Sequence, residues 1–172
     1  MLAEIVSEQE TGSVDMYRKM WGRFATGVTV ITTVETNGDV HGMTANSLTS
    51  VSLVPPLVLV CVSHDRNTFE LINRTGRFGI SVLEISQKSI ADFFSRPPED
   101  RVGDVPSEYV ELPGGWPVIS GAISQIGCEV VARHLAGDHT IFVAEVHSFV
   151  TRSGDPLIWY QGQFGYFVEG NE

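Results

Sequence analysis

Basic residues are scarce in this chain. It has 11 Lys and Arg against 21 Asp and Glu, which gives a formal net charge of −10. Such a surface repels phosphate backbones and anionic lipid headgroups, so neither nucleic acid nor membrane is an expected partner. A nucleotide can still bind if backbone N–H groups or local arginines hold its phosphates. Arg66, Arg74 and Arg77 are the candidates, because they follow one another closely along the chain.

Cysteine is also scarce, and its pattern excludes common disulfide and zinc motifs. The chain has only Cys61 and Cys128, both in apolar, strand-like sequence, and no C-x-x-C pair. We expect two buried, reduced thiols and a cytoplasmic protein. The acidic first residues lack the basic and apolar regions of a signal peptide. No apolar run approaches the roughly 18 residues expected of a membrane-spanning helix.

The usual catalytic motifs are missing. We find no G-x-G-x-x-G, no phosphate-binding P-loop and no G-x-S-x-G elbow. The histidines at 41, 64, 134, 139 and 147 contain no H-x-x-x-H pair, so no metal site is expected. No pair of carboxylates stands out for acid–base catalysis. A reaction carried by a cofactor, such as hydride transfer between stacked rings, fits this absence, because the protein then mainly binds, orients and excludes water.

What the chain does contain predicts one mainly β domain. Its 172 residues are 42% hydrophobic and only 19% charged. Asn37-Gly38 predicts a hairpin turn, and Gly137-Asp138 a turn between two long strands at 122–135 and 141–150. About seven strands with two or three short helices, without sustained strand–helix alternation, favour an antiparallel, Greek-key-like β-barrel. We expect a flexible acidic tail over 1–14 and a single domain over 15–170.

Short helices are expected around this barrel. Ser13 or Asp15 is expected to cap a first helix, whose apolar face ends before Gly27. A capping box from Asn67 to Glu70 is expected to open a second helix, closed by Gly76. Ser86 is expected to cap a third helix with an apolar face at Ile90, Phe93 and Phe94. Residues 96–115 are expected to form a long loop.

Residues 44–52 form the most informative segment. Six of these nine residues carry a hydroxyl or amide, and an apolar strand follows at 57–62. A polar loop wedged between strands needs partners for its donors and acceptors. A flat, heteroatom-rich ligand with a polyol tail, such as a flavin, supplies them, although an ordinary Ser/Thr-rich connection explains the composition as well. His139 lies at the turn between the two long strands, where a barrel rim meets its ligands.

Four segments resemble the short-chain flavin reductases, the reductase components of two-component flavin-dependent monooxygenases. They are residues 24–32, 41–58, 76–83 and 137–146, and with their spacing they cover about residues 15–167. The order of residues from Gly38 to Thr44 is similar to that of the reductase component of styrene monooxygenase. The resemblance implies a homodimeric, FMN-binding split barrel that uses NADH or NADPH to reduce FMN or FAD. It also implies a separate monooxygenase that receives the reduced flavin.

The same resemblance implies which residues meet the ligands. The ring edge and ribityl chain contact the polar segment, the phosphate lies at the start of the second helix, where an anion is favoured, and His139 positions the nicotinamide. The implied flavin contacts are Thr44, Ala45, Asn46, Ser47, Ser50, Val51 and Ser52, then Ser63, Arg66, Asn67 and Thr68 at the phosphate, and Phe93 and Ser95 at the distal end of the ring.

Two residues depart from the family pattern, and several alternatives stay open. Ser81 replaces a common Asn. Gln163 lies near a common Arg, and this loss of a positive charge puts the nucleotide preference and a C-terminal phosphate contact in doubt. Phe93 and Phe94 fit a hydrophobic core, and Trp159 fits either a ligand stack or an apolar dimer seam. The alternative functions are a non-enzymatic flavin- or haem-binding barrel, a flavoenzyme similar to pyridoxamine-phosphate oxidases, and a structural dimer module.

Overall fold

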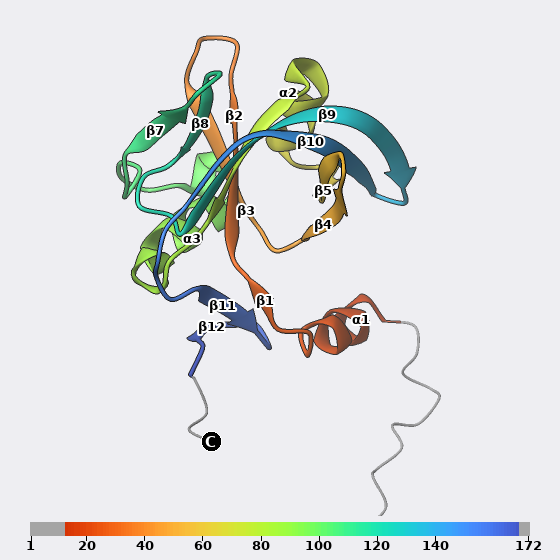
Figure 1. The fold of residues 1–172 in the computed structure, drawn as a ribbon. Helices are drawn as coiled ribbons and strands as arrows, with labels where there is room; N and C mark the ends of the chain where they lie inside the picture. The colour runs from red at the N-terminus through yellow and green to blue at the C-terminus, as the bar shows by residue number, and fades with distance from the viewer. Residues whose placement is uncertain (1–12, 169–172) are drawn as a thin grey trace, which may run out of the picture.

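The computed structural model describes residues 13–168 and centres on a curled antiparallel sheet of seven strands (Figure 1). The strand order is β3-β2-β6-β9-β10-β5-β4. The strands are β2 (Thr29–Val34), β3 (Val40–Ala45), β4 (Leu48–Leu53), β5 (Pro56–Ser63), β6 (Arg77–Val82), β9 (Ser124–Ala136) and β10 (His139–Thr151). The edge strands β3 and β4 are joined through Asn46 and Ser47 alone. The sheet therefore closes on itself without a ladder between its two edges, which confirms the predicted antiparallel barrel.

Two smaller sheets and three helices surround this barrel (Figure 1). Strands β1, β11 and β12 form one small sheet, and β7 and β8 form the other. Their bounds are β1 (Thr26–Gly27), β7 (Tyr109–Leu112), β8 (Trp116–Ile119), β11 (Leu157–Tyr160) and β12 (Gln163–Tyr166). The helices are α1 (Val14–Trp21), α2 (Asn67–Thr75) and α3 (Lys88–Ser95), with 3-10 turns at η2 (Ile85–Gln87) and η3 (Pro98–Asp100). The described chain thus holds twelve strands, more than the sequence predicted.

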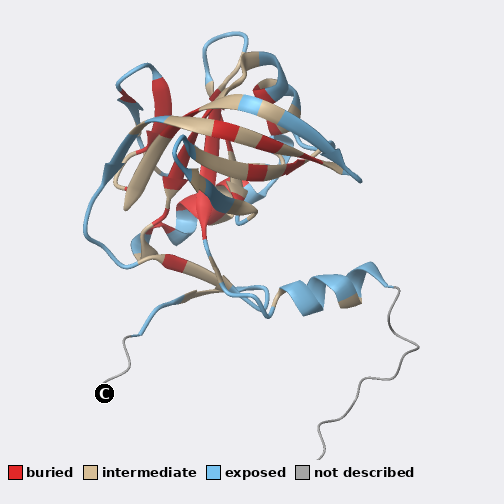
Figure 2. Cartoon of the chain, turned by 45° about the vertical axis from the view of Figure 1, so that its right-hand side comes forward, coloured by how far each residue is buried: buried red, intermediate tan, exposed pale blue. Residues whose placement is uncertain are grey.

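The hydrophobic core has two main parts. Inside the barrel, Ile31, Phe78 and Phe142 come from three strands and are almost completely buried. In a second buried cluster, Phe94 of α3 packs with Leu83. Figure 2 shows the buried residues concentrated in the barrel strands and on α3. One apolar face of α3 packs against this second cluster, and the helix lies beside β3.

Several predicted boundaries were wrong. The expected loop at 44–52 is mostly β4, which pairs with β5 at the sheet edge. The first helix is capped by Ser13, as one alternative stated, but it ends at Trp21 rather than near Gly27. The expected tail over 1–14 otherwise falls on residues outside the described range.

The other two helices also begin differently from the prediction. The capping box at Asn67 is wrong, because Arg66 is the N-cap of α2 and its side chain makes no capping bond. Gly76 does close α2, with a φ of 66°. Glu84 rather than Ser86 caps the turn before α3, and its carboxylate accepts from the Ser86 backbone N–H. The region expected to be one loop contains η3 and β7.

Helix α1 extends away from the barrel (Figures 1 and 2). None of its residues is buried, and the aromatic rings of Tyr17, Trp21 and the following Phe24 pack edge to face on one another. The side chains of Tyr17 and Trp21 are 61% and 52% exposed. The apolar face that the sequence predicts is therefore present but uncovered in a single chain. Within residues 13–168, no helix combines the length and apolar character needed to cross a membrane.

Candidate functional site: a pocket at the barrel seam

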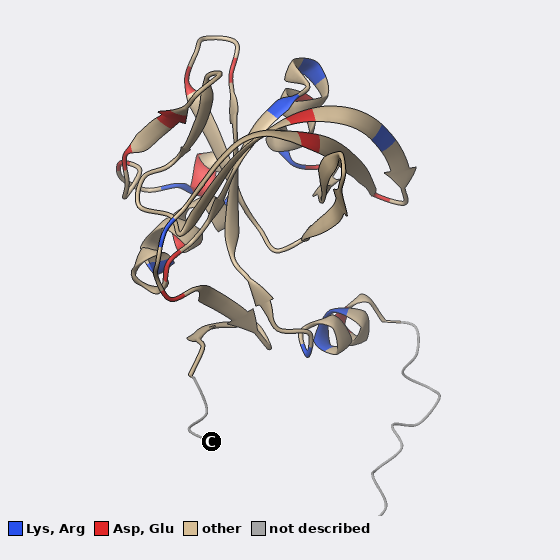
Figure 3. Ribbon diagram, in the orientation of Figure 1, with Lys and Arg blue, Asp and Glu red and all other residues tan. Residues whose placement is uncertain are grey.

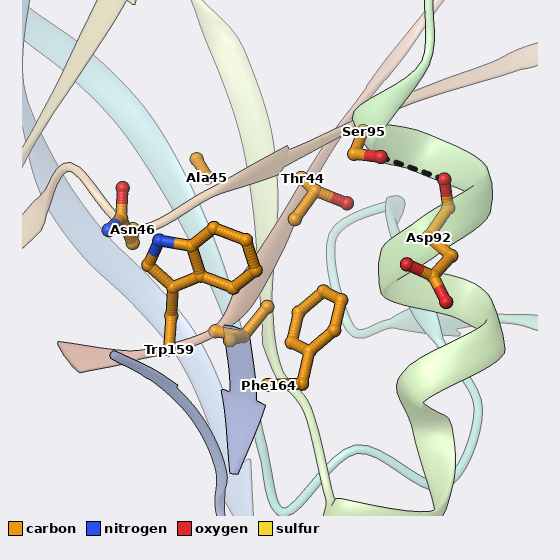
Figure 4. A pocket seen from close by; sticks show the side chains of 8 residues that line it. Thr44, Ala45, Asn46, Asp92, Ser95, Trp159 and Phe164 are labelled. Atoms are coloured by element: carbon orange, nitrogen blue, oxygen red, sulfur yellow. Dashed lines mark hydrogen bonds between the residues drawn. The ribbon is translucent and has the colours of Figure 1, made fainter. Parts of the chain in front are cut away.

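A pocket of about 270 Å³ opens where the end of β3, the last turns of α3 and the β11–β12 hairpin meet (Figure 4). Hydroxyl and amide groups form one side, and two aromatic rings form the other. Its lining residues are Val28, Thr44, Ala45, Asn46, Asp92, Ser95, Trp159 and Phe164. Four of these, Thr44, Ala45, Asn46 and Ser95, are residues that the sequence singled out for ligand contact.

The polar wall is held by hydrogen bonds to neighbouring elements. The Thr44 hydroxyl donates to the carbonyl of Ala91 at 2.7 Å, which ties β3 to α3. The Asn46 amide donates to the hydroxyl of Thr26 at 3.2 Å, and Asn46 itself is exposed. The Ser95 hydroxyl donates to the carbonyl of Asp92 at 2.8 Å. The polar groups are thus positioned by the protein while the Asn46 amide oxygen has no partner among the described residues.

The opposite wall is aromatic. Trp159 of β11 and Phe164 of β12 are cross-strand partners whose ring centroids lie 4.8 Å apart at an angle of 65°. Trp159 is half-buried and is also the cross-strand partner of Thr26 on β1, whose hydroxyl accepts from the Asn46 amide. Figure 4 shows both rings between β3 and α3, with the Asp92 carboxylate directed toward Phe164. The sequence left the role of Trp159 open and did not single out Phe164 or Asp92.

A second group of predicted residues lies along the neighbouring strand ends. The Ser47 hydroxyl donates to the carbonyl of Cys61 at 2.7 Å, and two residues further along β5, Ser63 is the register partner of His139 on β10. Three segments that are distant in sequence therefore meet at one end of the sheet. This is the end at which Asn46 and Ser47 bridge the two sheet edges.

His139 is oriented by the residue before it. Its Nδ1 lies 2.7 Å from a carboxylate oxygen of Asp138, and this hydrogen bond holds the pKa of Asp138 below its usual value. The His139 side chain is 42% exposed, and its Nε2 has no partner among the described residues. Nε2 is therefore the ring nitrogen that a ligand can reach. Asp138 was not among the predicted site residues, although its place next to His139 in a turn was visible.

The start of α2 is the expected phosphate position. Arg66 lies at the N-cap, and Asn67 is the first helical residue; both are exposed. No side chain caps this terminus, and the Phe69 N–H donates to the Arg66 carbonyl, so the backbone N–H groups of Asn67 and Thr68 are the ones available to an anion. Arg66 is paired with the carboxylate of its neighbour Asp65 at 3.7 Å, so an anion would compete with that exposed contact.

The three candidate arginines make separate contacts (basic residues are blue in Figure 3). Arg74 donates to the Thr36 hydroxyl at the β2–β3 hairpin. Arg77 stacks over Trp116 at 4.3 Å and pairs with Glu129 at 3.4 Å. Of the three candidates, Arg66 alone lies at the start of α2.

Other predicted contacts lie elsewhere. Thr68 is buried, and its hydroxyl lies 3.0 Å from Nε2 of the buried His41, whose pKa is lowered mainly by burial. We therefore assign Thr68 a structural role. Phe93 packs edge to face on Phe94, as the core alternative stated. Ser50, Val51 and Ser52 lie further along the edge strand β4. They are beside Val58 and Leu57 of β5 rather than beside Cys61.

The two cysteines and the two family departures have simple structural environments. Cys128 is buried, and burial raises its pKa to about 12, whereas Cys61 is only half-buried, in contrast to the prediction. The Ser81 hydroxyl is buried and accepts from the backbone N–H of Ile119 at 2.9 Å, which is a packing role. Gln163 is exposed on β12. Across residues 13–168, no three His, Cys, Asp or Glu side chains gather as a metal site requires.

The fold agrees with what the chain is similar to. Residues 21–167 match the model of the flavin reductase like domain family. The chain is 44% identical over 151 residues to an NADH-dependent flavin reductase of Rhodococcus sp, a match that covers 86% of this chain and 82% of that protein. The chain therefore belongs to the flavin reductase like domain family, and the resemblance in sequence is confirmed.

Two solved structures extend this agreement to three dimensions. The styrene monooxygenase flavin reductase of Pseudomonas putida S12 has a TM-score of 0.81 and 36% identity, covering 90% of this chain and 98% of that one. The NADH:FAD oxidoreductase SgcE6 of Streptomyces globisporus, in complex with NAD and FAD fragments, has a TM-score of 0.86 and 34% identity. That match covers 99% of this chain and 100% of the other. The predicted split-barrel class and the similarity to a styrene monooxygenase reductase are thus both confirmed.

Proposed function

We propose that this protein is a flavin reductase, which transfers a hydride from NADH or NADPH to FMN or FAD. The observation that carries the proposal is the seam pocket, whose lining combines the polar residues Thr44 and Asn46 with the aromatic pair Trp159 and Phe164. A planar ring with polar edges fits between such walls. The relatives named above, one of them solved with NAD and FAD fragments, support this assignment.

The residues of the pocket suit a flavin in three ways. The Asn46 amide oxygen is free to accept, and the Asn46 backbone lies outside the barrel ladders, so both can meet the ring edge. Ser47 and Ser63 lie along the direction in which a ribityl chain would run, and the uncapped start of α2 suits its phosphate. The polyol, ring and phosphate therefore each have a chemically matched partner along one end of the sheet.

The chain binds and orients rather than supplying acid–base groups. A bound flavin supplies the ring nitrogen that accepts a hydride from the reduced nicotinamide. His139, held by Asp138 through Nδ1, presents Nε2 toward the nicotinamide. Trp159 and Phe164 exclude water from one face of the pocket. The gain in rate then comes from holding the donor and acceptor atoms close and aligned.

The assay that tests this function mixes the purified protein with reduced nicotinamide and free flavin. We expect oxidation of NADH or NADPH to be much faster than in the flavin blank, with each flavin compared in parallel. Oxidation no faster than the blank contradicts the proposal. Tight flavin binding without turnover would favour a flavin-carrying barrel instead.

Replacing His139 with alanine is expected to raise the KM for NADH or NADPH. The substitution removes the side chain that presents Nε2 but leaves Asn46 and the aromatic wall untouched, so the flavin Kd should change little. Steady-state kinetics and flavin titration measure the two quantities separately. His134 is an exposed histidine on β9, and His134→Ala is the matched control. Unchanged nicotinamide kinetics in His139→Ala would remove His139 from the site.

We further propose that the reduced flavin passes to a separate monooxygenase, and that the protein works in the cytoplasm as a homodimer. The transfer of reduced flavin to a monooxygenase is supported by the similar structure named above, which is the flavin reductase of a styrene monooxygenase. The exposed aromatic face of α1 supports the dimer. The Gly22 carbonyl at the end of α1 accepts from the Gln161 N–H, which follows exposed Tyr160 of β11 in the chain. A second copy would cover the exposed aromatic face of α1.

The dimer makes a direct prediction for Trp21. Size-exclusion chromatography with light scattering should give about twice the chain mass of 18.8 kDa. Trp21→Glu places a charge on the uncovered face and should shift the protein toward the monomer without unfolding it, because Trp21 is half exposed in one chain. Glu108→Gln, at an exposed residue directly before β7, serves as the control. A Trp21→Glu protein of unchanged mass would exclude this face as the dimer interface.

A further inference from the structure

His64 joins two turns that carry different parts of the proposed site. Its backbone N–H donates to the carbonyl of Asp138 at 3.0 Å, and its ring Nε2 lies 3.0 Å from the hydroxyl of Thr140. Thr140 is only 3% exposed, so the second contact is anchored in the barrel wall. The other side of the ring packs on Phe69 of α2, with centroids 4.8 Å apart. The ring is thus fixed from two sides although the residue lies at the surface.

The contacts of His64 continue directly to His139. Asp138 accepts from the His64 N–H through its carbonyl and from His139 through its carboxylate. The β5–β10 ladder ends at the pair Ser63 and His139. Beyond that pair, the hydrogen bonds that join the two turns in the described chain come from His64 and from a long 3.5 Å contact of the Ser63 hydroxyl to the same carbonyl. Ser63 is paired with His139 directly, and movement of residues 64–67 is transmitted to His139 chiefly through His64.

We infer that His64 is a positioning residue that couples flavin binding at residues 63–67 to the orientation of His139. The inference rests on the proposed function. A flavin phosphate at the start of α2 restrains the segment that carries His64, and His64 then restrains Asp138 and His139. The nicotinamide nucleotide meets a turn that is already ordered and loses less conformational entropy on binding. The coupling is reciprocal, so the nucleotide strengthens flavin binding by the same factor.

The test compares nucleotide affinity with and without flavin. The flavin-free protein and the FMN- or FAD-saturated protein are each titrated with oxidised NAD, which does not react, by isothermal calorimetry. We expect wild-type protein to bind oxidised NAD about fivefold tighter, or more, when flavin is present. His64→Ala keeps the backbone N–H bond to Asp138 but loses the ring contacts with Thr140 and Phe69, so this ratio should fall clearly below the wild-type value. His64→Gln should recover part of it, because the glutamine amide can reach the position of ring Nε2. His134→Ala should keep the wild-type ratio.

A second variant removes the same contact from its other end. Thr140→Val keeps the side-chain shape but not the hydroxyl, and it should reduce the ratio as His64→Ala does, even if His64→Ala folds poorly. Equal ratios in wild type, His64→Ala and Thr140→Val would overturn the inference, while flavin reduction by the wild type would leave the proposed function standing. A wild-type ratio of one would also overturn the inference. A wild-type protein that binds neither flavin nor oxidised NAD would overturn both.

Discussion

Replacing Asn46 with leucine is expected to weaken flavin binding by about 1–3 kcal/mol, or roughly 5- to 150-fold in Kd. Asn46 lies at the seam with an amide oxygen that no described residue contacts, so in the proposed complex it accepts from a polar edge of the ring. Leucine has a similar size but leaves that edge unpaired. Titration of the flavin-free protein, followed by flavin fluorescence, measures the change directly.

The control for this variant is Asn73→Leu. Asn73 is exposed on α2 and is not part of the pocket lining. The substitution is therefore chemically the same as in Asn46→Leu but does not alter the proposed ring position. Its flavin Kd should match that of the wild type. If Asn46→Leu binds flavin as tightly as Asn73→Leu, the ring lies elsewhere on the protein and the assignment of the polar wall is wrong.

Among the substitutions considered, Gly79→Ala is expected to lower the free energy of unfolding the most. A Cβ on Gly79 would lie 2.3 Å from the carbonyl oxygen of Pro117 and 2.6 Å from the hydroxyl of Thr32. That hydroxyl donates to the same carbonyl, so the clash can be relieved only by separating β8 from the barrel. We expect a loss of about 3 kcal/mol, which corresponds to a decrease of roughly 6–12 °C in Tm for a chain of this size.

Gly165→Ala provides the comparison. A Cβ at Gly165 would meet no atom within 4 Å, and its φ lies outside the left-handed region, so the free energy of unfolding should change by no more than about 0.5 kcal/mol. Differential scanning calorimetry of both variants against the wild type tests the contrast. Equal Tm values for the two variants would show that the contact of Gly79 with β8 is not a tight one.

Local sequence patterns predicted the larger strands well. The Asn37-Gly38 turn and the long ribbon of β9 and β10 follow from turn chemistry and β-branched composition, which act over neighbouring residues. The segment at 44–52 was read as a loop because hydroxyl groups are common in loops. In the structure those groups lie on an edge strand, where one side of the ladder faces solvent and polar side chains are tolerated.

The pocket could be predicted only in part. Thr44 and Asn46 are only two residues apart in sequence, so their shared location was visible, and the resemblance added Ser95. Trp159 and Phe164 enter the pocket because β11 pairs with β1 and β12, and such pairing depends on register that sequence alone does not fix. Asp92 precedes Ser95 by three residues, so the helical period placed both on one face of α3 once the helix itself was recognised.

The meeting of β3 and β4 through Asn46 and Ser47 also has a mechanical meaning. A barrel whose neighbouring strands are all hydrogen-bonded can widen only by breaking backbone hydrogen bonds. This barrel can widen between its edge strands β3 and β4 without breaking any, because no ladder joins these two strands. In the proposed function, a flavin that enters or leaves beside this join would break no backbone ladder. The gap lies directly beside the polar wall, so the compliant part of the protein and the recognition groups coincide.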